Sequence, residues 1–172
     1  TGIFGPYMCK YDPLKIDLLN TYQNPSKEHI MGTDSLGRDT FTRLIYGARI
    51  TLTISVISVF SGAIIGIFLG VIAGYFGGWV DNLIMRVIDI LLAFPGLLLA
   101  IAIVAILGTG VINTMIAIAI YSIPYIARLI RGEVISIRDS EFIQACKVIG
   151  LSNIRIILFH IIPNSLSIVV VN

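Results

Sequence analysis

Charge is scarce in this chain. Only 13% of its 172 residues are Asp, Glu, Lys or Arg, whereas an average soluble domain has roughly 25%. None of these four residue types occurs between positions 50 and 80 or between positions 90 and 127. The net charge of +2 is too small to predict a nucleic-acid partner, and no basic patch interleaves with aromatic residues as binding to single strands requires. The composition therefore excludes an ordinary soluble domain and disfavours a nucleic-acid-binding one.

Residues that carry out catalysis are few. Histidine and cysteine each occur twice, at His29, His160, Cys9 and Cys146. The sequence contains neither the H-E-x-x-H motif of zinc enzymes nor the G-x-S-x-G motif of serine nucleophiles. Residues 32–39 have the glycine spacing of a phosphate-binding loop, but Arg38 and Asp39 stand where that loop needs Lys and Ser or Thr. We therefore expect no enzyme activity, no metal and no cofactor in this chain, and no ATP site of its own.

Apolar residues dominate instead. They make up 56% of the chain, and its mean hydropathy is +0.94. About 20 apolar residues cross the hydrocarbon core of a bilayer, so the first uncharged stretch holds one span and the second holds two. Gly108 and Gly110, with Asn113 just beyond, mark a tight reversal between those two. The sequence thus predicts an all-α integral membrane protein with spans at residues 50–74, 88–107 and 111–131.

Two further segments flank these spans. Phe41, Leu44, Ile45 and Ala48 share one helical face, with Asp39 and Arg43 paired on the polar side. This pattern predicts an interfacial helix that ends near residue 49. After Pro163 a fourth apolar run begins, and it is too short to cross a bilayer before the sequence stops. We therefore expect a fragment with three complete spans and the start of a fourth.

Residues 141–163 have the pattern of two short amphipathic helices joined at Gly150. Apolar residues recur at i, i+3, i+4 and i+7 in each half. They are Phe142, Ala145, Cys146 and Ile149 in the first half, and Ile154, Ile157, Leu158 and Ile161 in the second. Gly150 suits a helix C-terminus that needs positive φ, and Ser152 or Asn153 can cap the second helix. Each half is predicted to offer one apolar stripe to a partner surface.

Small residues form a ridge on the first span. Glycine recurs there at every fourth position, at Gly62, Gly66, Gly70 and Gly74. Such spacing lets helix backbones approach closely in lipid. It predicts helix packing, within this subunit or against a partner subunit, and the alternative is that the ridge lines a translocation path.

The charged residues near residue 88 have two interpretations. Arg86 and Asp89, at i and i+3, can pair on one helix face at the membrane edge. The alternative is that Asp81, Arg86 and Asp89 form part of an inner gate or contact an ATPase.

Several of these segments resemble one family. Residues 141–163 resemble the EAA loop of type I ABC-importer permeases, with Gln144, Ala145 and Cys146 at the E-A-A positions and the Gly150 to Pro163 spacing intact. Residues 29–52, HIMGTDSLGRDTFTRLIYGARITL, look like the signature that precedes the second span in dipeptide, oligopeptide and nickel permeases. Two further stretches are similar to that subfamily, RVIDILLAFPGLLLAI at residues 86–101 and YDPLKIDLLN at residues 11–20.

The resemblance implies a type I ABC-importer permease fold in the inner membrane of a prokaryotic cell. It implies an extracytoplasmic segment at residues 1–49 and a truncated transmembrane domain at residues 50–172, with a cytoplasmic coupling loop at residues 132–163. It implies that one set of loop residues couples transport to the ATPase: Glu141, Phe142, Gln144, Ala145, Cys146, Ile149, Gly150 and Pro163.

The same resemblance implies partners and a substrate class. The partners are a homologous second permease, two ABC ATPase subunits that bind ATP and Mg, an extracytoplasmic solute-binding protein and the lipid bilayer. Short peptides are the favoured substrate, and nickel or a metal chelate is the alternative. A helical channel or an intramembrane enzyme is the alternative of a different class. Neither of these needs a loop of two short helices that presents an apolar stripe.

Overall fold

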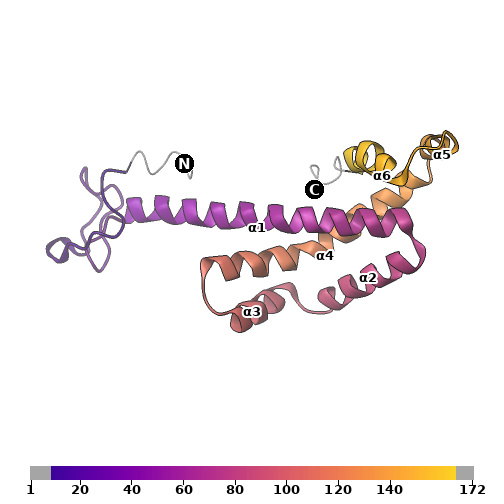
Figure 1. Cartoon of the computed structure of the whole chain (residues 1–172). Coiled ribbons are helices and arrows are strands. Elements are labelled where there is room, and N and C mark those ends of the chain that lie inside the picture. Colours follow the sequence, from indigo (N-terminus) through magenta and orange to yellow (C-terminus); the bar gives the residue numbers. More distant parts are fainter. Residues whose placement is uncertain (1–8, 166–172) are drawn as a thin grey trace. The chain divides into compact units, whose positions relative to one another are not determined.

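The structure is a computed structural model that describes residues 9–165 (Figure 1). The chain divides into two compact units, Thr1–Val56 and Ile57–Asn172. Helix α1, Thr40–Phe76, begins in the first unit and ends in the second. Throughout the described residues the regular structure is helical, and the only β-type pairing is an isolated bridge between Thr33 and Asp39. The predicted all-α fold class is confirmed.

The first unit is held together around the carboxylate of Asp34. Its Oδ1 accepts hydrogen bonds from the backbone N–H groups of Leu36 at 2.9 Å and Arg38 at 3.0 Å, and its Oδ2 pairs with the side chains of Arg38 and Arg43. Gly37, with φ of +69°, closes the turn. Partial burial raises the pKa of Asp34, but the hydrogen bonds from Arg38 and Leu36 outweigh this and lower it to about 2. The segment at residues 32–39, which has the glycine spacing of a phosphate-binding loop, therefore forms a turn.

Asp39 starts helix α1. Its carboxylate accepts a hydrogen bond from the backbone N–H of Thr42 at 2.8 Å and lies 2.9 Å from Nδ1 of His29. An aspartate at this position satisfies a donor that the first turn of a helix leaves unpaired. The predicted pair between Asp39 and Arg43 is wrong, because Arg43 pairs with Asp34 instead.

Helix α1 is longer than predicted. We expected an interfacial helix up to residue 49 followed by a separate span, but α1 is a single helix of 37 residues. Its rise of about 1.5 Å per residue makes it about 55 Å long, against about 30 Å for a hydrocarbon core. The interfacial pattern and the span are continuous because no proline or helix-ending glycine separates them.

The second predicted span, residues 88–107, is broken. Helix α2, Gly78–Leu92, and helix α3, Gly96–Leu107, meet at an angle of 89°. Pro95 causes the break, since it lacks an N–H group and disfavours a helical conformation in the residue before it. Within residues 9–165, two helices are long and apolar enough to cross a membrane, or up to three if the bent pair counts as one span.

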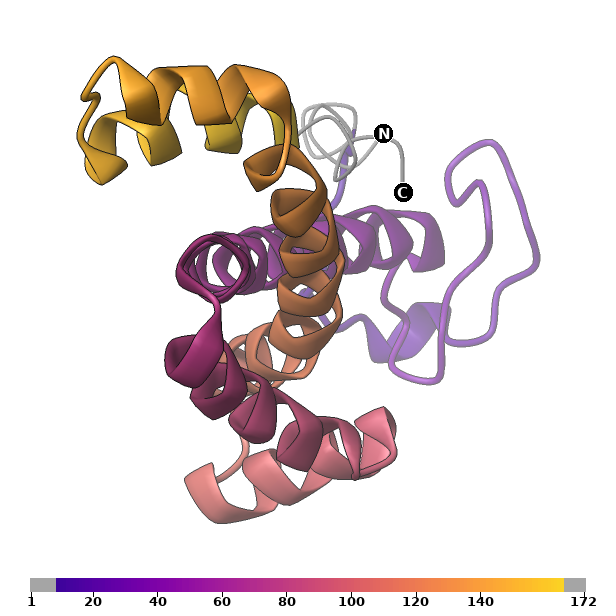
Figure 2. The same cartoon turned by 90° about the vertical axis from the view of Figure 1, so that its right-hand side faces the viewer.

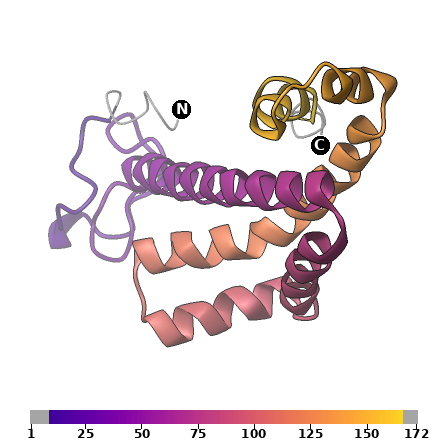
Figure 3. The same ribbon diagram turned by 45° about the vertical axis from the view of Figure 1, so that its right-hand side comes forward.

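Helix α4, Val111–Arg138, is the third predicted span and extends beyond residue 131. The reversal that precedes it is confirmed: the Asn113 side chain donates to the carbonyl oxygens of Leu107 at 2.8 Å and Gly108 at 3.0 Å. Pro124 lies inside α4 without ending it. Figure 3 shows α4 between α3 and the C-terminal half of α1.

The segment after α4 folds back as a hook (Figure 2). We define the hook as helix α5, Glu141–Val148, helix α6, Asn153–Ile156, and the π-helical turn η3, Ile157–Ile161. The predicted pair of short helices around Gly150 is confirmed, and Gly150 has φ of +85°. The predicted start of a fourth span falls mainly on residues 166–172, which lie outside the described residues.

Candidate functional site

A buried apolar cluster joins the hook to two long helices. The cluster contains residues of α1, of α4 and of both halves of the hook. Its buried members are Val71, Tyr75, Ile130, Val134, Ile143, Cys146, Ile156 and Ile161. Burial of such side chains contributes about 1.5 to 3 kcal/mol for each large one. The hook is therefore packed as part of the helical unit.

Six large apolar side chains of the hook are exposed. We call these residues of α5, its C-terminal turn, α6 and η3 together the outer face. They are Phe142, Val148, Ile149, Ile154, Leu158 and Phe159, each at least half exposed. Large exposed apolar side chains gathered on one short segment are typical of an interaction site.

The two predicted stripes do not each form one face, and this part of the prediction is wrong. Cys146 and Ile161 point into the buried cluster, whereas Ile149 and Ile154 are 79% and 71% exposed. The reason is that α5 packs through Ile143 together with Cys146, at i and i+3, and Ile143 was not in the predicted stripe. Ala145, which was, is exposed.

The remaining predicted loop residues occupy distinct places. Glu141 begins α5 as the acidic residue of its first turn, and Gln144 donates from Nε2 to the carbonyl oxygen of Asp139 at 3.2 Å. Pro163 follows η3, where the N–H of Ile162 bonds to the carbonyl oxygen of Ile157. Proline cannot supply a helical donor, and a π-helical turn is a common way for a helix to change register at a functional site.

An aromatic contact and a glycine joint connect the two halves of the hook. The rings of Phe142 and His160 meet edge to face with centroids 5.1 Å apart. At Gly150 the N–H bonds to the carbonyl oxygen of Lys147, and the N–H of Leu151 bonds to that of Cys146. This is the glycine-ended helix terminus that the sequence predicts.

Polar contacts also tie the hook and α4 to the end of α1. The hydroxyl of Tyr75 donates to Oδ1 of Asn153 at 2.7 Å, and Nζ of Lys147 lies 5.6 Å from the centre of the Tyr75 ring. Nη1 of Arg138 donates to the carbonyl oxygen of Gly74 at 3.0 Å. Sequence reasoning missed Tyr75, because its partner Asn153 lies 78 positions away.

The glycine ridge faces α4. A Cβ atom added at Gly66, Gly70 or Gly74 would lie within 3.0 Å of atoms of α4, and one added at Gly62 would also collide with it. The contacted carbonyl oxygens belong to Ala119, Ile123, Ala127 and Arg131, so both helices advance by four residues per step. Helices α1 and α4 therefore run parallel, in close contact along the ridge.

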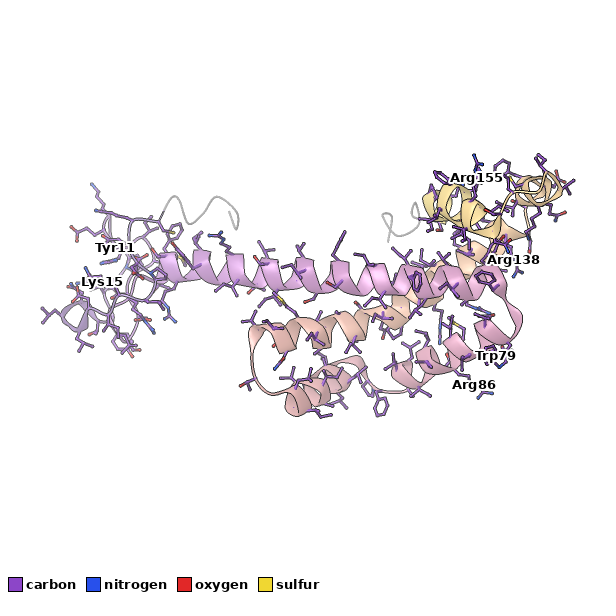
Figure 4. All side chains as sticks on the ribbon, in the orientation of Figure 1. Tyr11, Lys15, Trp79, Arg86, Arg138 and Arg155 are labelled. Atoms are coloured by element: carbon purple, nitrogen blue, oxygen red, sulfur yellow. The ribbon has the colours of Figure 1, made fainter. Side chains whose placement is uncertain are left out.

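Two ion pairs join α2 to α4. Asp81 receives two hydrogen bonds from Arg131, at 2.5 Å and 2.6 Å, and Asp89 receives one from Arg128 at 2.5 Å. The predicted pair between Arg86 and Asp89 is wrong, since Asp89 faces α4. Arg86 is exposed and lies on the side of α2 away from α4 (Figure 4). The structure thus brings two of the three predicted charged residues to α4.

Long apolar helices with a packed hook at the end of α4 define a multi-pass helical membrane protein. Residues 66–172 match the family of binding-protein-dependent transport system inner membrane components, and the chain belongs to this family. The fold is accordingly that of type I ABC permeases, and the protein resides in the inner membrane. The predicted resemblance is confirmed.

Similar proteins are permeases of dipeptide and glutathione transport systems. The dipeptide transport system permease protein DppC of Alkalihalophilus pseudofirmus is 51% identical over 170 residues, which are 99% of this chain and 56% of that protein. The glutathione transport system permease proteins GsiD of Escherichia coli O6:K15:H31 and Shigella boydii serotype 4 are each 49% identical over 171 residues, again 99% of this chain and 56% of the relative. The chain thus spans about half the length of these relatives.

Proposed function

We propose that this chain belongs to a membrane-spanning permease subunit of an ATP-driven importer of short peptides. The observation that carries the proposal is the hook, whose inner face is buried against α1 and α4 while its outer face is apolar and exposed. A segment that transmits the movement of a partner to the membrane helices needs both a buried inner face and an exposed outer face. A helical channel or an intramembrane enzyme needs neither.

In this proposal two ABC ATPase subunits bind ATP and Mg, and one of them receives the outer face of the hook. The proposal gives the chain no ATP site of its own, because Arg38 and Asp39 stand where a phosphate loop needs Lys and Ser or Thr. A homologous second permease completes the path, and an extracytoplasmic binding protein delivers the substrate.

Transport follows alternating access between two states of the permease. Closure of the ATPases displaces the hook, and the buried cluster passes this displacement to α1 and α4 together. The pairs of Asp81 with Arg131 and Asp89 with Arg128 extend the connection to α2. In this proposal the glycine ridge is the surface through which α1 packs on α4.

The names of the relatives support peptide substrates, since one is a dipeptide permease and two are glutathione permeases. A nickel or metal-chelate importer is the alternative. The test is uptake by proteoliposomes that contain the full-length subunit, its second permease and ATPases, with the binding protein added. We expect uptake of a labelled dipeptide that requires ATP and the binding protein. Uptake of Ni²⁺ alone would select the alternative, and uptake without ATP would indicate a channel.

The orientation of the hook has its own test. Thr109 lies before α4 and Ser136 lies near its end, both exposed. We expect a cysteine at Thr109 to react with a membrane-impermeant thiol reagent in intact cells, and cysteines at Ser136 and Gly78 to be protected. The background lacks Cys9 and Cys146. Labelling at Ser136 with protection at Thr109 would put the hook outside and overturn the proposal.

A further inference from the structure

Tyr75 occupies the junction of α1 with the hook. It lies in the last turn of α1, one residue before its end, and it is only 7% exposed. Its ring belongs to the buried cluster, and its hydroxyl reaches Asn153 at the start of α6 at 2.7 Å. Nζ of Lys147 on α5 lies over the same ring, 5.6 Å from the ring centre. One side chain of α1 thus contacts both halves of the hook, on either side of Gly150.

The hydroxyl gives this junction a defined register. Apolar contacts such as those of Ile143 and Ile156 are non-directional, so the hook could slide over α1 and keep most of them. A hydrogen bond from a buried hydroxyl is directional, and leaving its partner unsatisfied is unfavourable. The bond from Tyr75 to Asn153 therefore fixes where the hook sits on α1.

The chain connection makes this bond more important for α1 than for α4. Helix α4 leads directly into the hook through Asp139 and Ser140, so any displacement of the hook reaches α4 through covalent bonds. The chain offers no such direct path from the hook to α1, whose end is followed by α2. Helix α1 therefore follows the hook through noncovalent contacts alone, directly at Tyr75 and indirectly through its packing on α4.

We propose that Tyr75 is a positioning residue that ties the hook to α1 and makes α1 move with α4 during transport. This role rests on the proposed function of the hook. Loss of the hydroxyl leaves the ring, the cluster and the contact with Lys147 in place. It removes only the fixed register, so ATP is hydrolysed while less of the displacement reaches α1.

The test compares variants of the full-length subunit in the reconstituted transporter. For Tyr75→Phe we expect normal assembly and normal basal ATP hydrolysis, with peptide transported per ATP lowered about fivefold, the size of one net hydrogen bond. Asn153→Ala should give the same loss. Asn153→Asp keeps an acceptor oxygen and should retain coupling. Tyr125→Phe, which removes the hydroxyl of an exposed tyrosine on α4, is the matched control.

The outcomes separate this role from the proposed function. If the unmodified transporter hydrolyses ATP without any stimulation by the binding protein, the proposed function fails. If it is stimulated and Tyr75→Phe transports as much peptide per ATP, the positioning role is wrong. Should Tyr75→Phe fail to assemble, equal ratios for Asn153→Ala and Asn153→Asp would overturn the role. A double variant, Tyr75→Phe with Asn153→Ala, should be no worse than either single one, and additive losses would also overturn it.

Discussion

Gly70 tests the close contact between α1 and α4. In Gly70→Ala the new Cβ would lie 2.6 Å from the carbonyl oxygen of Ala127 and 2.9 Å from Cβ of Ile130. Ordinary contacts of this kind are 3.4 to 4 Å, and neither a backbone carbonyl nor the fully buried Ile130 has space to yield. The two helices must therefore separate locally by about 1 Å, the kind of overpacking that costs about 1 to 3 kcal/mol.

A gain partly offsets this cost, because alanine favours a helix over glycine by about 1 kcal/mol. We expect Gly70→Ala to lower the free energy of unfolding of the full-length subunit by about 1 to 2 kcal/mol. Gly132→Ala on α4 is the matched control, since nothing lies within 4 Å of its added Cβ. That variant should be neutral or up to about 1 kcal/mol more stable.

The assay is unfolding of the purified subunit in mixed micelles by titration with SDS, before any partner is added. Because the ridge packs within the subunit, the defect should already be present there, and blue-native electrophoresis should show impaired assembly only as its consequence. A Gly70→Ala subunit as stable as Gly132→Ala would mean that α1 and α4 are farther apart than in the structure. A stable subunit that fails to assemble would place the ridge against the second permease.

Three further predictions concern separate parts of the chain. Gly150→Ala places a side chain at φ of +85°, which costs about 1 to 2 kcal/mol, so substrate-stimulated ATP hydrolysis should fall while membrane insertion is intact. Arg131→Ala leaves the 14% exposed carboxylate of Asp81 unpaired, and we expect about 2 kcal/mol less stability in the same SDS titration. The pKa of Asp34 is lowered to about 2 from 3.8, so its stabilising contribution is present above about pH 4 and is lost as the pH falls toward 2. The protection factor of the Leu36 amide, the intrinsic exchange rate divided by the observed rate at the same pH, should therefore fall in that range.

Each of these has a control. Gly150→Asn should keep more of the stimulated hydrolysis than Gly150→Ala, because asparagine tolerates positive φ. Full activity of Gly150→Ala would contradict the proposed role of Gly150 as the joint between the two halves of the hook. Arg86→Ala, which removes an exposed arginine of α2, should be nearly neutral, and equal losses from both arginine variants would argue against the Asp81 pair. Asp34→Asn should make the protection factor at Leu36 independent of pH, and an unchanged pH dependence of that factor would assign the titration to another group.

Local signals in the sequence predicted the parts of the fold that depend on a few neighbouring residues. Gly150 ends α5 at positive φ, and Gly108 with Asn113 closes the turn before α4, as their residue types indicate. Pro95 was visible as a helix breaker, but the angle of 89° at that point depends on how α2 and α3 each pack on α4. A rule about one residue gives the place of a bend more readily than its size.

Partners far apart in the sequence were not predicted. Arg131 lies 50 positions from Asp81, and helical spacing alone favoured the wrong pair of Arg86 with Asp89. The prediction of the buried face of the hook failed for a related reason. Periodicity places Cys146 and Ile149 on the same side of a helix, but only tertiary packing decides which of them is buried.

Helix α4 is the element on which these contacts meet. The glycine ridge of α1 packs on one side of it, the carboxylates of α2 reach its arginines, and Tyr121 of α4 lies where a side chain at Gly96 of α3 would collide. Small residues such as Ala119 and Ala127 are buried on α4 and allow this close approach, which drives helix association in lipid more than apolar burial does. Because α4 also leads directly into the hook, the proposed displacement of the hook would enter the helical unit through the helix on which α1, α2 and α3 pack.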